Sequence, residues 1–297
     1  MRQFSHPSLG SLGIAAVLAV AAAACSNDGT APGTPFLSQI QADTMSEELA
    51  FDAEDQISGA TASGVASSSA GAPAGPLAPS GPAQCTPTRS PASPTDTDGD
   101  GVADTVRLDF TGCVFSWPLE TDTVRGTIDV LDPTKTVSDH AVERIFTNLA
   151  LVRVFTISGK WTSATRNGTR MTNWDATTLQ HSETNFRTDY VFRDGATASH
   201  VKTWSSRFTA DVPGSIQRDA ALPSGNSSIN GTSSWTRGVR SYALTVTTNA
   251  PLHYNASCDK FPRFDAGTLQ AAVTRNGQTM IVSITFAACG VYTVTRS

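Results

Sequence analysis

From position 105 to the last residue, the chain alternates apolar and polar residues with a period of two. The segment TVRLDFT at 105–111 places apolar side chains at every second position, and VRGTIDV at 124–130 follows the same pattern. Successive side chains of a strand point to opposite faces, so this alternation predicts strands with one face buried and one face in water. No helical pattern of comparable length interrupts the region, and we expect it to be all-β.

Turn signals separate the predicted strands. Asn-Gly or Asp-Gly dipeptides, which favour two-residue hairpin turns, stand at 167–168, 194–195, 230–231 and 276–277. The runs between turns number about twelve and lie near 105–111, 123–131, 141–149, 152–165, 169–179, 183–192, 196–209, 228–236, 239–248, 267–274, 279–287 and 291–296. These antiparallel strands joined by hairpins predict one large open or curled sheet, a sandwich or a barrel-like arrangement.

Aromatic residues concentrate in the predicted strands. Four of the five tryptophans lie there, namely Trp161, Trp174, Trp204 and Trp235. Together with Tyr190, Phe192 and Phe208, they can form a stripe across neighbouring strands. Such a stripe would suit a glycan-binding face, with flat rings for stacking and polar neighbours for hydroxyl groups. The alternative, which we favour, is ordinary packing of aromatic rings across strands.

An acidic segment precedes the first long strand. Its carboxylates are Asp96, Asp98, Asp100 and Asp104, at positions 1, 3, 5 and 9 of a loop with glycine at position 6. Calcium binds about six to eight oxygens, and alternate carboxylates converge when such a loop curls. The EF-hand pattern requires Glu at position 12, where this chain has Arg107. The loop instead resembles the calcium loops of dockerin-like and thrombospondin-type repeats. A calcium site of low affinity and an acidic turn at a domain border both stay open.

The region before this loop has a different composition. Residues 26–104 contain eleven acidic residues and one basic residue, whereas 105–297 contain fifteen acidic and nineteen basic residues. The segment 36–57 is rich in helix formers and predicts a short acidic helix, either docked on a basic surface or marginal in a solvated arm. We expect the second. Residues 58–93 are mostly Ala, Ser, Gly, Pro and Thr, which predicts a flexible tether.

The N-terminal segment has the organisation of an export signal. Arg2 and His6 stand in a short polar region, apolar or small residues fill 12–24, and three alanines precede Cys25. A bilayer-spanning helix needs about 20 apolar residues, so the run is too short to remain in the membrane. The segment resembles a bacterial lipoprotein signal ending in a lipobox, with Ala22 where Leu is most frequent. An ordinary secretory signal cut after Ala24 is the alternative.

The lipoprotein resemblance implies a division of the chain into segments and a location of the protein in the cell. Residues 1–24 would be removed, 25–95 would carry the lipid anchor, the helix and the tether, and 96–297 would form the β domain. Cys25 would carry the acyl chains, including palmitate, that hold the protein to a membrane without crossing it. Ser26 after the cysteine suggests the outer membrane, at its periplasmic face or at the cell surface.

The other four cysteines favour two disulfides. Each of two similar segments, TVRLDFTGCVF and MIVSITFAACGVY, contains a cysteine that follows another cysteine by about thirty residues. The simplest of the three possible connectivities pairs Cys85 with Cys113 and Cys258 with Cys289. An oxidising compartment makes disulfides the default, and no C-x-x-C or Cys-His spacing indicates a metal site.

No common hydrolase, zinc or nucleotide motif occurs, and the histidines stand singly. The spread of basic residues is unlike a nucleic-acid-binding surface, so no nucleic-acid partner is expected. The β region resembles uncharacterised β-rich lipoproteins of the bacterial envelope, a resemblance that implies no activity. We therefore expect a non-enzymatic, membrane-anchored interaction or structural domain that binds no cofactor, with calcium at the acidic loop left open. A glycan- or peptidoglycan-binding module, an envelope-protein partner and a lipid carrier with a cavity inside a curled sheet are the alternatives.

Overall fold

The computed structural model describes residues 37–60, 87–116, 120–134, 136, 140–155, 159, 161–217, 221–238, 240–260 and 262–297. The predicted signal segment 1–24, Cys25, Cys85 and most of the predicted tether lie outside these residues. Helix α1 is followed by thirteen strands: α1 (Gln39–Ala60), β1 (Thr88–Ser90), β2 (Thr105–Asp109), β3 (Cys113–Ser116), β4 (Glu120–Leu131), β5 (His140–Phe155), β6 (Trp161–Trp174), β7 (Thr178–Val191), β8 (Thr197–Ala210), β9 (Gly225–Arg237), β10 (Arg240–Tyr254), β11 (Phe264–Arg275), β12 (Gln278–Ala288) and β13 (Val291–Arg296).

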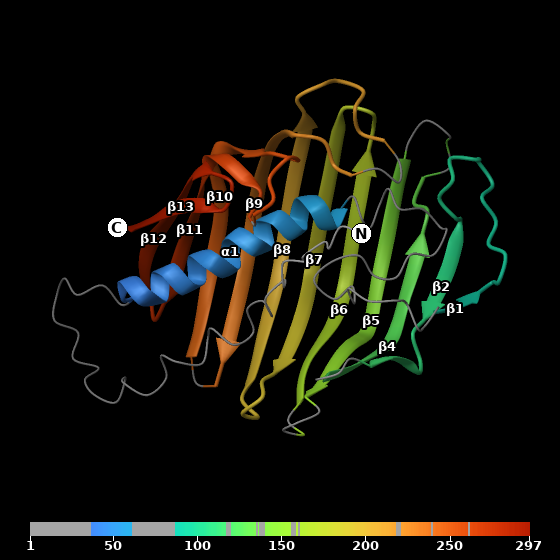
Figure 1. Cartoon of the computed structure of the whole chain (residues 1–297), viewed down its shortest axis with the longest axis horizontal. Helices are drawn as coiled ribbons and strands as arrows, with labels where there is room; N and C mark the ends of the chain where they lie inside the picture. The colour runs from blue at the N-terminus through green and yellow to red at the C-terminus, as the bar shows by residue number, and fades with distance from the viewer. Residues whose placement is uncertain are drawn as a thin grey trace, which may run out of the picture.

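The strands form one antiparallel sheet that does not close. Its order is β1-β2-β4-β5-β6-β7-β8-β9-β10-β11-β12-β13 (Figure 1). β3 pairs with the first part of β4, and β2 pairs with its second part. The predicted all-β class is therefore confirmed, with an open sheet as its architecture. The alternation also holds in detail: in β8, Trp204, Ser206 and Phe208 are buried, whereas Ser205 and Arg207 between them are exposed.

Two of the four predicted hairpin turns are confirmed and two are wrong. Asp194–Gly195 joins β7 to β8 and Asn276–Gly277 joins β11 to β12, but Asn167–Gly168 lies inside β6 and Asn230–Gly231 lies inside β9. At Gly168, φ is 130° and a Cβ atom would lie 2.8 Å from the Cα atom of Phe186 on β7. The glycine lets two curved strands approach closely at an irregularity in their register. The region 140–191 therefore contains three strands, β5 to β7, where the sequence predicted four.

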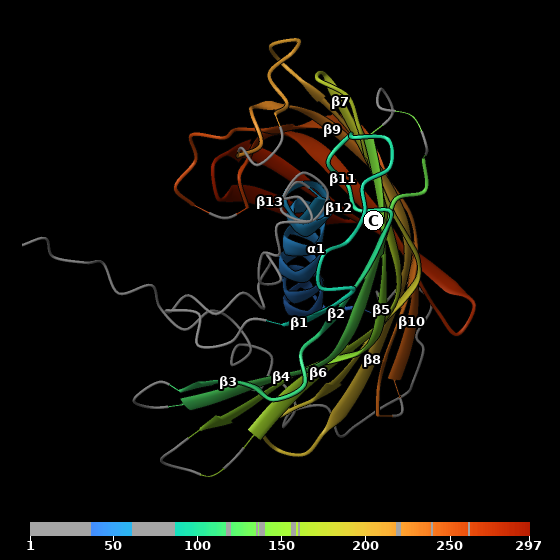
Figure 2. The same cartoon turned by 90° about the vertical axis from the view of Figure 1, so that its right-hand side faces the viewer.

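The sheet curls around α1, which crosses its concave face diagonally (Figures 1 and 2). At the start of the helix, the Arg296 side chain of β13 donates to the carbonyl oxygen of Leu37. Near its end, the Ser206 hydroxyl of β8 donates to the carbonyl oxygen of Gln56 at 3.5 Å. The helix was predicted, but its placement in a solvated arm is wrong. Within the described part of the chain, no helix is long and apolar enough to cross a membrane.

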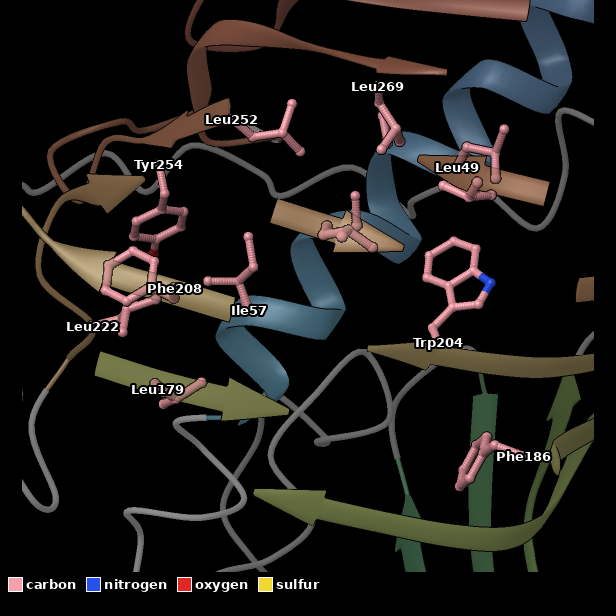
Figure 3. Packing of buried hydrophobic residues seen from close by; sticks show 14 of the residues in the cluster. Leu49, Ile57, Leu179, Phe186, Trp204, Phe208, Leu222, Leu252, Tyr254 and Leu269 are labelled. Atoms are coloured by element: carbon pink, nitrogen blue, oxygen red, sulfur yellow. The ribbon is translucent and has the colours of Figure 1, made fainter. Parts of the chain in front are cut away.

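The core fills the space between the helix and the concave face. The helix contributes the buried side chains Ala42, Leu49, Ala50, Ala53 and Ile57, and Leu37 just before it is also buried. Figure 3 shows Leu49 and Ile57 among side chains of the strands, including Trp204 and Leu269. Burying a leucine or isoleucine side chain contributes about 1.5–3 kcal/mol, and three alanines let the helix backbone approach the sheet closely. Tertiary packing therefore stabilises this acidic helix.

One disulfide of the predicted pair is confirmed, between Cys258 and Cys289. Cys113 is also disulfide-bonded. Its predicted partner, Cys85, lies outside the described residues, so that pairing stays a prediction. The confirmed bond joins the loop after β10 to the turn between β12 and β13.

Candidate functional site

Opposite charges hold α1 on the concave face. The helix contains six acidic residues and neither lysine nor arginine. Asp52 Oδ1 accepts a hydrogen bond from Lys202 Nζ of β8 at 3.1 Å. Glu54 accepts from Arg263 Nε at 2.5 Å and from the Arg263 backbone N–H at 2.8 Å. Of the two interpretations of this helix, the one in which it docks on a basic surface of its own domain agrees with these contacts.

Beneath the helix lies a buried cluster of charges on neighbouring strands. Glu183 of β7 pairs with Arg170 of β6 at 2.7 Å and with Lys202 of β8 at 3.4 Å. Burial alone would raise the pKa of Glu183, but the charges of Lys202 and Arg170 outweigh it and lower that pKa to about 2. Burial, with the charge of Arg170 added, lowers the pKa of Arg144 on β5 to about 9. The sheet side of this cluster therefore has more positive than negative charge, and Asp52 of the helix complements it.

The contact between helix and sheet also buries polar atoms whose hydrogen bonds are not satisfied within the described part of the chain. They are Ser46 Oγ and both side-chain polar atoms of Gln56 on α1, Trp204 Nε1 of β8, and Ser227 Oγ and Ser233 Oγ of β9. A buried polar group without a partner costs about 1–3 kcal/mol. The helix is therefore held less firmly than an apolar contact of the same area would hold it.

The structure does not bring the four tryptophans into one exposed stripe. Trp204 is 1% exposed, Trp174 is buried against the His140 ring, and Trp161 is exposed. Trp235 is half-buried and lies 5.6 Å from Tyr190, ring centre to ring centre, and Tyr190 stacks on Phe192 at 6.1 Å. Part of the predicted aromatic group thus forms a small patch at the ends of strands β7 and β9, beside the β7–β8 turn.

The acidic loop lies between β1 and β2. Carboxylate oxygens of Asp96, Asp98 and Asp100 lie within 4.8 Å of one another. Asp96 accepts hydrogen bonds from the backbone N–H groups of Gly99 and Gly101, each at 2.8 Å, which curls the loop.

Asp104, the fourth predicted ligand, has a different environment from the other three. Its carboxylate accepts hydrogen bonds from Thr95 Oγ1 at 2.8 Å, from the Thr97 backbone N–H at 3.2 Å and from Thr97 Oγ1. The structure therefore brings three of the four predicted ligands together and places Asp104 where it closes the loop. Calcium binding itself stays a prediction.

A second polar cluster, at the opposite half of the sheet, joins three segments. His253 of β10 lies between Asp265 of β11, at 2.6 Å from Nδ1, and Asp211 after β8, at 2.9 Å from Nε2. The bonds to Asp211 and Asp265 raise the pKa of His253 against the opposing effect of burial. Because both ring nitrogens are engaged, this histidine is arranged to connect segments and not to take a proton from a substrate.

Comparisons with protein-family models, with curated proteins and with solved structures find no match. The interpretation of function therefore depends on the geometry of the concave face, the acidic loop and the N-terminal sequence.

Proposed function

We propose that this protein is a membrane-anchored lipoprotein of the bacterial envelope whose curled sheet is a non-enzymatic binding domain. The observation that carries the proposal is the placement of α1 across the concave face, which brings the chain that follows the lipobox-like segment into the core of the domain. The sheet offers a large curved surface, as an interaction domain requires.

The length of chain between the proposed anchor and the folded body supports this arrangement. Only eleven residues, 26–36, separate Cys25 from Leu37, the first described residue. Fully extended, a segment of this length reaches at most about 40 Å. The longer low-complexity segment 61–86 connects α1 to β1, two elements of the same folded body. The domain is thus proposed to work close to the membrane surface.

Mass spectrometry of the N-terminal peptide tests the anchor. From protein isolated from membranes of a Gram-negative host, we expect a peptide beginning at Cys25 with a thioether-linked diacylglyceryl group and an amide-linked acyl chain. The Cys25→Ser variant should move from the membrane fraction to the soluble periplasmic fraction. An unmodified cysteine at the N-terminus of the mature chain would contradict the lipoprotein proposal.

A lipid carrier is a second candidate function, favoured by the chemistry under α1. The concave face combines the large apolar side chains Trp204, Phe208 and Leu252 with the cations of Lys202 and Arg170. An acyl chain with an anionic head group matches that combination, and the unsatisfied polar atoms beneath the helix favour exchange of α1 for such a ligand.

Native mass spectrometry of the Cys25→Ser protein, which lacks the anchor, tests this second candidate. The double variant Leu49→Ala, Ile57→Ala, which weakens helix packing, should retain more co-purified fatty acid or phospholipid than the wild-type domain. The exposed change Asp43→Asn on the same helix is the matched control. Absence of bound lipid from both the wild-type domain and the double variant would rule out the carrier.

Glycan binding depends on the patch of Tyr190, Phe192 and Trp235. If this alternative holds, Trp235→Ala abolishes retention on peptidoglycan. The same change at the exposed Trp161, which the register of β6 against β7 places on the opposite face of the sheet from Tyr190, leaves it unchanged. Equal retention of both variants and the wild-type protein would remove the patch as the binding site.

A further inference from the structure

The loop between β1 and β2 faces a buried carboxylate from a distant part of the sequence. Asp132 follows β4 directly and is 5% exposed. Its backbone N–H donates to the carbonyl oxygen of Asp104 at 3.3 Å, which places it at the end of the acidic loop. The pairing of Thr105 with Leu131 between β2 and β4 fixes this position.

The two oxygens of Asp132 have different environments. Oδ1 accepts hydrogen bonds from the backbone N–H and the hydroxyl of Thr134, both at 2.9 Å. Oδ2 is buried and has no hydrogen-bond partner among the described residues. Asp98 Oδ2, in the loop, is buried in the same way. Two carboxylate oxygens thus lie near the loop without a donor, which is unfavourable unless a cation joins them.

The negative charges also act on one another. Partial burial, together with the charges of Asp100 and Asp132, raises the pKa of Asp98 above its usual 3.8. Asp100, whose side chain is fully buried, lies 3.5 Å from Nδ1 of His140, at the start of β5. The three carboxylates of the loop have oxygens within 4.8 Å of one another, and the buried carboxylate of Asp132 lies close enough for its charge to act on Asp98.

We propose that a calcium ion binds between the loop Asp96–Asp100 and Asp132, and so joins the β1–β2 connection to the end of β4. A hard divalent cation prefers carboxylate oxygens, and four carboxylates supply enough of them for the coordination shell of calcium. At position 12 of the loop, where the EF-hand pattern has a glutamate ligand, this chain has Arg107. Asp132, which follows strand β4, supplies a carboxylate in its place. Magnesium binds more weakly, because it requires an octahedral shell and keeps its waters.

Calorimetric titration of the full chain in detergent with CaCl₂, after removal of metal with EDTA, tests the site. We expect one equivalent to bind with a Kd between about 0.1 and 1 mM, and MgCl₂ to bind more weakly. Asp132→Asn and Asp98→Asn should each weaken calcium binding by about tenfold or more. Asp129→Asn is the matched control, because Asp129 is on β4 but its carboxylate binds the exposed Arg107 at 2.6 Å. It should leave the affinity unchanged.

Thermal unfolding shows whether Asp132 is a calcium ligand or a residue that only stabilises the fold. Asparagine keeps an oxygen for Thr134 and removes a negative charge, so Asp132→Asn should leave the Tm of the metal-free protein equal or higher. The increase in Tm that calcium gives the wild-type protein should be lost. No calcium uptake up to about 10 mM would overturn the proposal. So would wild-type affinity in Asp132→Asn, or an equal fall in Tm with and without calcium.

Discussion

Arg263 and Glu54, 209 positions apart in sequence, are joined by two hydrogen bonds, from the backbone N–H and from Nε of the arginine to the two carboxylate oxygens. Glu54 is buried, and Arg263 also lies over the Tyr254 ring at 5.0 Å. The pair fixes α1 against the segment that enters β11. It therefore links the part of the chain that follows the proposed anchor to the C-terminal half of the sheet.

Removing the charge of Glu54 should loosen the helix. Glu54→Gln keeps the shape of the side chain but leaves Arg263 without its carboxylate, and we expect the free energy of unfolding to fall by about 1–3 kcal/mol. Amide exchange within α1 should accelerate. Asp43→Asn, at an exposed position of the same helix, should change neither quantity appreciably. Equal behaviour of the two variants would show that the pair does not hold the helix.

The contribution of the buried charge cluster to stability should depend on pH in the acid range. Glu183→Gln removes the carboxylate that Arg170 and Lys202 share and leaves Lys202 with Asp52, so stability should fall by about 3–5 kcal/mol at neutral pH. Because the folded-state pKa of Glu183 is lowered from 4.5 to about 2, its stabilising effect is present above pH 4.5 and is lost as the pH falls through that range. Urea unfolding at several pH values measures this difference. Asp189→Asn, in a surface pair with Arg187, should cost at most about 1 kcal/mol.

The glycine inside β6 should be more sensitive to substitution than one in a hairpin turn. A Cβ atom at Gly168 would meet the backbone of Phe186, whereas one at Gly195, where φ is 82°, would meet nothing within 4 Å. Gly195→Ala should therefore cost about 1–2 kcal/mol from backbone strain alone, and Gly168→Ala should cost about 1–3 kcal/mol more. Chemical denaturation measures both. Equal costs would mean that β6 and β7 are not this close.

His253 should stabilise the fold most in mild acid. Because its pKa is raised above 6.5 by Asp211 and Asp265, its contribution is fully present below pH 6.5 and is lost as the pH rises through the higher folded-state value. His253→Gln should therefore lower the Tm more at low pH than at alkaline pH. Asp211→Asn should show the same trend. A constant difference in Tm across this range would contradict the arrangement.

Local patterns predicted most of the long strands but not the short strands β1 and β3. In β8, for example, the alternation between buried Trp204, Ser206 and Phe208 and the exposed residues between them is visible in the sequence. The turn preference of Asn-Gly predicted a turn correctly at Asn276–Gly277 and incorrectly at Asn167–Gly168. The difference depends on how closely the curled strands approach, which no local pattern encodes.

The candidate sites were harder to predict from the sequence than the strands. The loop of Asp96, Asp98 and Asp100 was visible from its spacing, but the position of Asp132 depends on the register of β2 against β4. The cluster of Glu183 with Lys202 likewise forms only when β7 pairs with β8. The burial of α1 was missed because its small buried residues, such as Ala50 and Ala53, give little helical periodicity.

Amide hydrogen exchange across residues 39–60 of the full chain tests most directly whether α1 occupies the concave face. Most of the stability of a helix in a protein comes from tertiary packing, so slow exchange across the 22 residues of α1 requires docking. We predict that amides around Leu49 and Ile57 exchange as slowly as those in the middle of β8 and β9. Exchange of the whole segment at the rate of an unstructured peptide would contradict the account.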